Sequence, residues 1–107
     1  MITISIKGGT VRLNVTNVTY IESQGHTLIF HTVNGIYETS GTMKELEKEL
    51  SELNFYRGNK GYLINLAHVE SVKDGCAVVR GEQLLLSRAR KKEFMEALTR
   101  YWGEVIK

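Results

Sequence analysis

The sequence predicts a mainly β fold, built of short antiparallel strands and two helices. Apolar and polar residues alternate over much of the chain, and the dipeptides Asn34-Gly35 and Asp74-Gly75 lie between such segments, as in β-hairpins. Helical spacing of apolar residues appears at only two places. One buried and one solvated face is typical of antiparallel sheets. The alternation of strand and helix that builds nucleotide-binding α/β folds is not present in the pattern.

Length and composition place the chain among ordinary globular proteins. Its 107 residues are expected to form a single domain, residues 1–107, with 42% hydrophobic and 24% charged residues. No apolar run approaches the ~20 residues of a membrane span, and no basic segment precedes an apolar stretch at the N-terminus. The single cysteine, Cys76, excludes an internal disulfide. We therefore expect a cytoplasmic protein without a membrane span.

The first forty residues contain the clearest strand patterns. Isoleucines alternate with polar residues at the N-terminus, and Gly8-Gly9 then turns the chain. Asn34-Gly35 predicts a two-residue hairpin turn in which both residues have positive φ. The expected strands in this part of the chain are 2–6, 11–15, 18–21, 27–33 and 36–39.

The next segment changes to helical spacing. Thr42 and Glu45 form a capping box, which predicts a helix with Thr42 as its N-cap. The helix is expected to cover about three turns, with apolar positions at Met43, Leu46, Leu50 and Leu53. Because its other face is net acidic, we expect this helix to cover a sheet and not to contact phosphates.

Strand patterns then resume and end in a second helix. The polar segment 58–61 separates two of these strands, and Asp74-Gly75 predicts a hairpin turn between two others. The expected strands are 55–57, 62–66, 68–72, 76–79 and 83–86. The C-terminal helix is marked by Phe94, Leu98, Tyr101, Trp102 and Val105.

Signatures of enzymes and metal sites are missing from the sequence. It contains no Walker loop, no Gly-x-Gly-x-x-Gly and no His-Glu-x-x-His motif. The three histidines, His26, His31 and His68, lack the spacing of metal ligands, and Cys76 lies in an apolar strand, as a small core residue does. Ser23 and His26 on one loop do not make a catalytic triad. We expect no catalytic activity, cofactor, metal or small-molecule substrate.

Positive charge is concentrated in one third of the chain. The formal net charge is only +2, but residues 57–92 contain eight basic and three acidic residues, a charge of +5. Such clustering is typical of a surface that binds a polyanion, although scattered solvated lysines give the same composition.

Three polar loops contain residues able to contact nucleic acid: 24–26, 58–61 and 87–92. Arg and Lys match the guanine acceptors of the major groove, and Asn matches the adenine edge. The basic cluster at the start of the second helix suits phosphates, and Ser87 is expected to be the N-cap there. Residue type alone does not separate base contacts from ordinary surface charge.

Four segments, in this order along the chain, resemble the LytTR DNA-binding domain. These are Tyr20-Ile21-Glu22-Ser23, then Gly25-His26, then residues 55–65 with the sequence FYRGNKGYLIN, and finally Ser87-Arg88 ahead of Lys91-Lys92. The resemblance covers nearly the whole chain. It implies an elongated β-β-β sandwich, with one covering helix and a C-terminal helix, that binds duplex DNA through loops between strands.

The resemblance also implies roles for individual residues. His26, Lys60 and Arg88 are expected to contact bases, one from each loop, in successive major grooves of DNA that bends on binding. Further contacts to DNA or phosphate are expected from Gln24, Arg57, Asn59, Ser87, Arg90, Lys91 and Lys92. The implied function is sequence-specific transcription regulation in bacteria, by a stand-alone regulator or by the output domain of a two-component response regulator. The expected partner is double-stranded DNA, at direct-repeat promoter sites, bound in tandem or by a homodimer.

The central loop departs from the family pattern at two positions. Asn59 stands where the family usually has His, and Gly61 where it has Ser. The target sequence is therefore expected to differ from that of other members. Two other functions stay open: an RNA-binding β-module, for which Phe55, Tyr56 and Tyr62 are the candidate stacking residues, and a protein-interaction or dimerisation module that uses Tyr101, Trp102 and Val105.

Overall fold

A computed structural model describes residues 1–103, and in this range ten strands form three antiparallel sheets. A two-stranded sheet joins β1 (Ile2–Ile6) and β2 (Gly9–Leu13). The central sheet has the order β5-β4-β3-β7-β6, with strands β3 (Val18–Gln24), β4 (Thr27–Thr32), β5 (Gly35–Ser40), β6 (Phe55–Asn59) and β7 (Tyr62–Asn65). The third sheet has the order β10-β9-β8, with strands β8 (Val69–Lys73), β9 (Cys76–Val79) and β10 (Glu82–Leu85).

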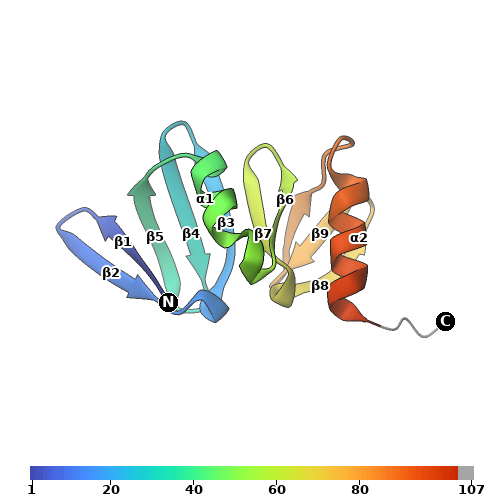
Figure 1. The fold of residues 1–107 in the computed structure, drawn as a ribbon, viewed down its shortest axis with the longest axis horizontal. Coiled ribbons are helices and arrows are strands. Elements are labelled where there is room, and N and C mark those ends of the chain that lie inside the picture. Colours follow the sequence, from blue (N-terminus) through green and yellow to red (C-terminus); the bar gives the residue numbers. More distant parts are fainter. Residues whose placement is uncertain (104–107) are drawn as a thin grey trace.

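The three sheets follow one another along a body of 50 × 25 × 24 Å, so the predicted elongated β-β-β sandwich is confirmed (Figure 1). Helix α1 (Met43–Leu50) packs on the central sheet, and helix α2 (Lys91–Trp102) packs at the end of the body that holds the third sheet. Short 3-10 turns span Val15–Asn17, Ser51–Leu53 and Leu66–His68.

The central sheet is shared by two hydrophobic cores. Tyr20 pairs with Ile64, and both belong to the core formed with the third sheet and α2. The next pair along the same strands, Ile21 and Leu63, belongs to the other core, formed with β1, β2 and α1. Because successive strand residues point to opposite faces, β3 and β7 connect the two cores. Both ends of the long body are therefore fixed to one sheet.

One hairpin turn was predicted correctly and another was not. Asp74 and Gly75 have φ values of 54° and 79°, as a type I′ turn between β8 and β9 requires. The β4–β5 hairpin also exists, but its turn residues are Val33 and Asn34, since Thr32 pairs with Gly35. Asn34 is not among the positive-φ residues, and Gly35 begins β5 with φ 139°. The Thr32 hydroxyl stabilises this turn by donating to the Gly35 carbonyl (2.7 Å) and accepting from Asn34 N (3.1 Å).

The first helix is shorter than predicted. Thr42 is its N-cap as expected, and its hydroxyl accepts from the Glu45 amide at 3.3 Å. The α-helix ends at Leu50 and continues only as a 3-10 turn, which leaves Leu53 46% exposed and outside the core. Asn54, in a left-handed conformation with φ 65°, ends the segment. A polar residue that tolerates positive φ stops the helix before the apolar stripe is complete.

The second helix begins later than predicted, and Ser87 is not its cap. Its N-cap is Arg90, without a side-chain capping bond, and the Ser87 carbonyl instead accepts from Arg90 N (3.1 Å) and Lys91 N (2.9 Å) in a preceding turn. Phe94 and Leu98 are buried as expected. Tyr101 and Trp102 are each 44% exposed, and Val105 lies outside the described residues.

Several strand boundaries also differ from those predicted. The strand predicted over residues 11–15 ends at Leu13, and a 3-10 turn follows it. β3 continues to Gln24, and β6 includes Gly58 and Asn59, which were expected in a loop. The Arg80-Gly81 turn between β9 and β10 (φ 48° and 83°) was not predicted, since arginine seldom adopts this conformation. Cys76 is only partly buried and is not a core residue.

Candidate nucleic-acid interface

Three connections of the chain reach the same long edge of the body, at the top of Figure 1. They are the β3–β4 turn, the β6–β7 turn and the segment from β10 to α2, and we call this side the loop edge. Because β3 and β7 are neighbours in the central sheet and β10 belongs to the next sheet, the fold places the three predicted loops in a row. Segments that lie more than sixty residues apart in the sequence thus share one surface.

Backbone hydrogen bonds join the three connections. Ser23 N donates to the carbonyl of Gly61 (2.9 Å), which ties the β3–β4 side to the β6–β7 turn. Ser87 N donates to the carbonyl of Gly58 (2.8 Å), which ties the β6 strand to the segment before α2. Gly58 has no room for a side chain, because a Cβ there would lie 2.6 Å from Ile64 Cδ1 and 3.1 Å from Leu86 Cδ2. The loop edge is therefore a connected unit packed directly on the core.

The three residues predicted to contact bases lie at the tips of these connections. His26, Lys60 and Arg88 each occupy a turn, and all three are exposed. Among residues 1–103, none of the three takes part in an ion pair. Gln24, Lys91 and Lys92 are also exposed on the same connections. Gln24 Nε2 donates to Glu22 Oε2 (3.3 Å), whereas His26, Lys60 and Arg88 are available to an external ligand.

Arg57 has partners inside the protein. Its guanidinium donates to the carbonyls of Asn59 (3.2 Å) and Lys60 (3.0 Å) and to Glu47 Oε1 on α1 (3.0 Å), and its side chain is only 10% exposed. The carboxylate of Glu47 also lies 3.9 Å from Arg90 Nη1. Sequence reasoning missed Glu47, because its acidic helix was expected only to cover a sheet. Arginine with several carbonyl partners and a carboxylate holds a loop in shape.

Asn59 is likewise bonded on both sides of its amide. Its Nδ2 donates to the carbonyl of Leu85 (2.6 Å), and its Oδ1 accepts from Gly61 N (2.7 Å). Ser87 and Arg90 are only partly exposed. The central loop thus has two bonded residues, Arg57 and Asn59, beneath one exposed tip, Lys60. The sequence offered one signal for this arrangement, since Asn commonly bonds the backbone two residues further on.

The other two histidines are held within the fold. His31 stacks on Tyr20 with ring centroids 4.1 Å apart, and its Nε2 lies 3.0 Å from Glu22 Oε1. His68 Nε2 lies 2.6 Å from the carbonyl of Thr16. Within residues 1–103, no group of three His, Cys, Asp or Glu side chains is arranged to hold a metal ion. Neither helix in this range combines the length and the apolar character that crossing a membrane requires.

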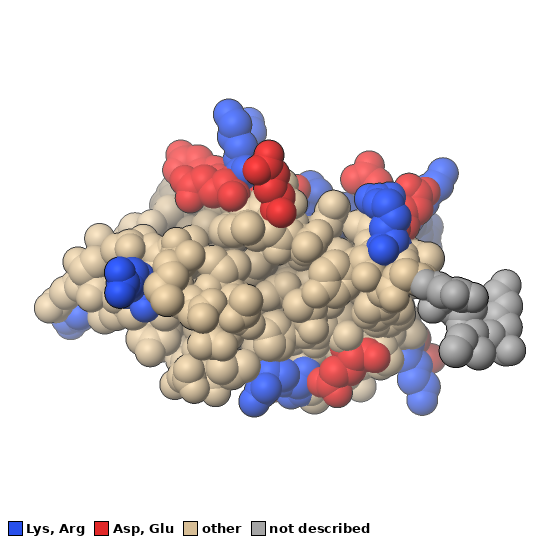
Figure 2. All heavy atoms as spheres, turned by 60° about the horizontal axis from the view of Figure 1, so that its bottom comes forward, with Lys and Arg blue, Asp and Glu red and all other residues tan. Residues whose placement is uncertain are grey.

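The opposite long edge has a different surface. Figure 2 turns this edge forward and shows a broad central area without Lys, Arg, Asp or Glu; charged residues appear along its upper and lower margins, and one Lys or Arg group lies within the face towards its left end. The 3-10 turns Val15–Asn17 and Leu66–His68 lie on this side (Figure 1). A polyanion finds little positive charge there, so the loop edge is the better candidate for contact with nucleic acid.

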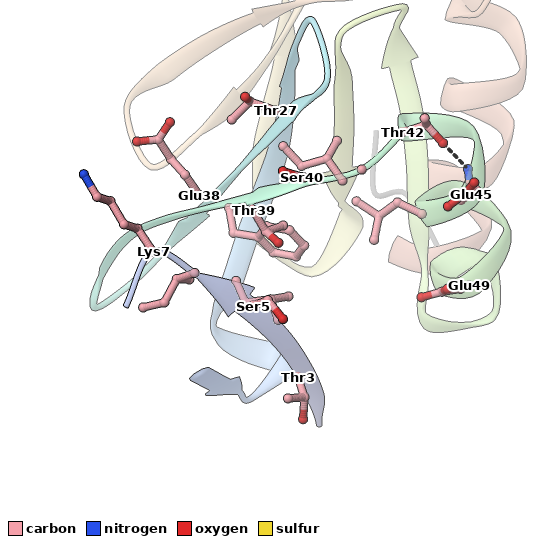
Figure 3. Close-up of a pocket in the computed structure, with 16 residues that line it drawn as sticks. Thr3, Ser5, Lys7, Thr27, Glu38, Thr39, Ser40, Thr42, Glu45 and Glu49 are labelled. Carbon is pink, nitrogen blue, oxygen red and sulfur yellow. Dashed lines mark hydrogen bonds between the residues drawn. The ribbon is translucent and has the colours of Figure 1, made fainter. Parts of the chain in front are cut away.

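A groove lies towards the end of the body that holds β1 and β2, between β1, β5 and α1 (Figure 3). Its volume is about 790 Å³, and its floor includes the buried Leu28 and Phe30. The charged residues that line it are Lys7, Glu38, Glu45 and Glu49. Three carboxylates against one ammonium make this groove net acidic, which disfavours contact with a phosphate backbone.

Aromatic side chains do not form a stacking platform on the central sheet. Phe55 is fully buried, and Tyr56 and Tyr62 are partly buried against a core. These were the candidate stacking residues of an RNA-binding module, which needs exposed rings. Tyr101 and Trp102, near the end of α2, are more exposed.

Comparison with known proteins agrees with this geometry. The family model described as the LytTr DNA-binding domain matches residues 8–99. Among solved structures, the fold is similar to the LytTr DNA-binding domain of a putative methyl-accepting/DNA response regulator from Bacillus cereus, with a TM-score of 0.77 and 16% sequence identity over 91% of this chain and 94% of that one. A comparison with curated proteins finds no match.

Proposed function

Because the chain belongs to the LytTR DNA-binding domain family, we propose that it recognises a specific duplex DNA sequence through the loop edge and thereby regulates transcription. DNA binding is the activity of this family, and the finer mechanism is our proposal. The regulator acts in bacteria, either alone or as the output domain of a two-component response regulator.

One observation supports the proposal most strongly: three exposed, hydrogen-bonding tips from three separate connections lie along a single edge of the protein. His26, Lys60 and Arg88 are the tips, and backbone bonds from Ser23 and Ser87 hold their connections together. Specific readout needs side chains that reach base edges from a rigid support. In this proposal each tip enters a major groove and contacts bases.

Phosphate contacts are assigned to the residues around the tips. Lys91 and Lys92 are exposed at the start of α2, where positive charge and helix-terminal N–H groups both attract anions. Gln24 and Ser87 flank the outer tips, and Arg90 lies beside them. Arg57 and Asn59 support these contacts by holding the loops in shape, because their polar atoms already bond to the backbone of the loops.

The shape of the molecule suits a duplex that is contacted at more than one groove. The long axis measures 50 Å, whereas one turn of B-DNA rises roughly 34 Å. The three loops follow one another along this axis, so they can lie along a duplex, and bending the duplex would bring the outer loops closer to it. Two copies placed on a direct repeat would extend the contact further without requiring a dimer in solution.

The test is selection of bound duplexes from a random DNA pool at ~150 mM salt, where binding by charge alone is weak. We expect a recurrent sequence motif, and single-stranded RNA should compete poorly against it. Recovery of random sequences by folded protein would refute sequence-specific recognition. Preferential binding of single strands would favour the RNA-binding alternative.

A second candidate function, contact with another protein, is favoured by Tyr101 and Trp102. Each is 44% exposed on the last turn of α2. Tyr and Trp are enriched at protein interfaces. Sedimentation at two concentrations tests self-association, and an unchanged monomer mass would exclude this surface as a dimer contact under those conditions.

A further inference from the structure

The amide of Asn59 lies between two of the loops that contain base-reading candidates. Asn59 is adjacent to Lys60 in the chain, and its Nδ2 donates to the carbonyl of Leu85, 26 residues further on. From Leu85, the chain runs two residues to Ser87 and then to Arg88. The Asn59 side chain therefore joins the support of one tip to the support of the other.

A backbone bond reinforces the same junction. Ser87 N, next to Arg88, donates to the carbonyl of Gly58, next to Asn59. The two bonds run in opposite directions: β6 donates one of them, and the segment after β10 donates the other. A substitution does not readily remove the backbone bond, whereas replacing Asn59 with alanine removes both of its side-chain bonds, to the Leu85 carbonyl and from Gly61 N.

Arg57 completes the support of Lys60. By donating to the carbonyls of Asn59 and Lys60, it limits how the turn itself can move. Movement of the whole turn relative to Arg88 is instead limited by the junction at Leu85. The two supports thus restrict different motions, and the Asn59 bond adds a side-chain link between the turn of Lys60 and the segment of Arg88, beside the backbone bond from Ser87 to Gly58.

We infer that Asn59 is a positioning residue that couples Lys60 to Arg88, so that the two tips bind DNA as one unit. The inference rests on the proposed function and deepens it. Preorganised contacts cost less ordering on binding than independent ones, and contacts that share a support are energetically non-additive. The departure from histidine at this position therefore acts on loop geometry and not through a direct base contact.

A double-mutant cycle measures this coupling. Lys60→Ala and Arg88→Ala are each expected to weaken binding to the selected site about tenfold. In the otherwise unchanged protein, the double variant should bind the selected site at least about threefold more tightly than the product of the two single losses predicts. In an Asn59→Ala background the two losses should multiply, within about twofold.

Two further variants separate positioning from general structure. Asn59→Asp keeps the acceptor for Gly61 N but loses the donor to the Leu85 carbonyl, so it should abolish the coupling as Asn59→Ala does. Asn14→Ala is the matched control, because Asn14 makes the same kind of bond, to Thr16 N, at the opposite edge. It should leave the coupling unchanged. Asn59 is partly exposed, and thermal unfolding should confirm that its variants fold.

The outcomes are distinct. Suppose that the unchanged protein binds the selected site specifically, but that the coupling between Lys60 and Arg88 is the same with and without Asn59. The inference is then overturned, and the proposed function stands. If Asn59→Asp retains full coupling, the bond to Leu85 is not its source and the inference is likewise overturned. If the unchanged protein shows no sequence preference, the proposed function fails, and the inference fails with it.

Discussion

Both long edges of this protein contain asparagine side chains that bond to the backbone, but the two edges differ in the residues beside them. The edge opposite the loop edge holds the 3-10 turns Val15–Asn17 and Leu66–His68, and we call it the turn edge. There, polar side chains bond to the nearby backbone: Asn65 donates to the carbonyl of Val18 (2.8 Å) and accepts from Ala67 N (3.0 Å), and Asn14 accepts from Thr16 N (3.1 Å). At the loop edge, Asn59 makes comparable bonds, but the neighbouring Lys60 is exposed. The difference lies in what surrounds each asparagine.

A candidate DNA-binding surface is therefore recognised from two features together: polar residues bonded within the protein and exposed side chains at the tips of the loops. At the turn edge Asn14 and Asn65 bond to the backbone, and the surface there shows a wide uncharged area (Figure 2). The loop edge has internal bonds beneath and exposed cations above. A surface prepared for a polyanion needs both, because a cation on an unsupported loop loses conformational entropy when it binds.

The largest expected effect is on stability, at the turn edge. Asn65→Ala removes two bonds from a residue that is 4% exposed and leaves the buried Val18 carbonyl without its side-chain donor. We expect a loss of ~2–3 kcal/mol in unfolding free energy, measured by urea denaturation. DNA affinity of the folded protein should not change. A loss of affinity without loss of stability would show that the two edges are not separate in function.

The next effect is on binding, at the loop edge. Arg88→Ala and His26→Ala should each cost ~1–3 kcal/mol on the selected DNA site and relax the preference at the base pairs that they contact. Both residues are exposed, so unfolding free energies should stay within ~0.5 kcal/mol of the original protein. Titration against the selected and a scrambled duplex measures this. Equal losses on both duplexes would mean that these residues do not read sequence.

The free energy of unfolding should fall at alkaline pH because of Tyr20 in the central sheet. Burial, followed by the charges of Glu82 and Glu22, raises the pKa of Tyr20 to about 12 from its ordinary value of 10.0. The unfolded chain loses this proton first, so the contribution to stability is complete below pH 10 and declines as pH rises towards 12, by about 1.4 kcal/mol per pH unit. Tyr20→Phe should flatten this part of the stability profile. An unchanged slope in that variant would assign the decline to other groups.

The smallest effect concerns phosphate contact. Lys91→Ala should weaken binding to all duplexes alike and reduce the slope of log affinity against log salt concentration by about one. Lys7→Ala is the matched control, since Lys7 lines the groove between β1, β5 and α1, away from the loop edge. If the two variants change the slope equally, the loop edge has no special part in phosphate binding.

Local patterns predicted the elements well where their causes are local. The Thr42 cap and the Asp74-Gly75 turn depend on residues within four positions of one another, and both are present. The Asn34-Gly35 turn was placed one residue too late, because the Thr32 hydroxyl stabilises a different pair of turn residues. Helix length was overestimated, since the pattern of apolar residues continued to Leu53, whereas the α-helix ends at Leu50 and a 3-10 turn with Asn54 as its C-cap follows.

The sequence by itself determined which segments are strands and helices, that three polar loops contain candidate DNA-contacting residues, and the family to which the order of motifs points. Only the tertiary structure decided which loop residues face outward. Arg57 and Asn59 are the same residue types as many DNA contacts, but their partners come from Glu47, ten residues away, and Leu85, 26 residues away. Folding brings those partners within hydrogen-bond distance, and a buried or half-buried polar group takes the partner that it finds there.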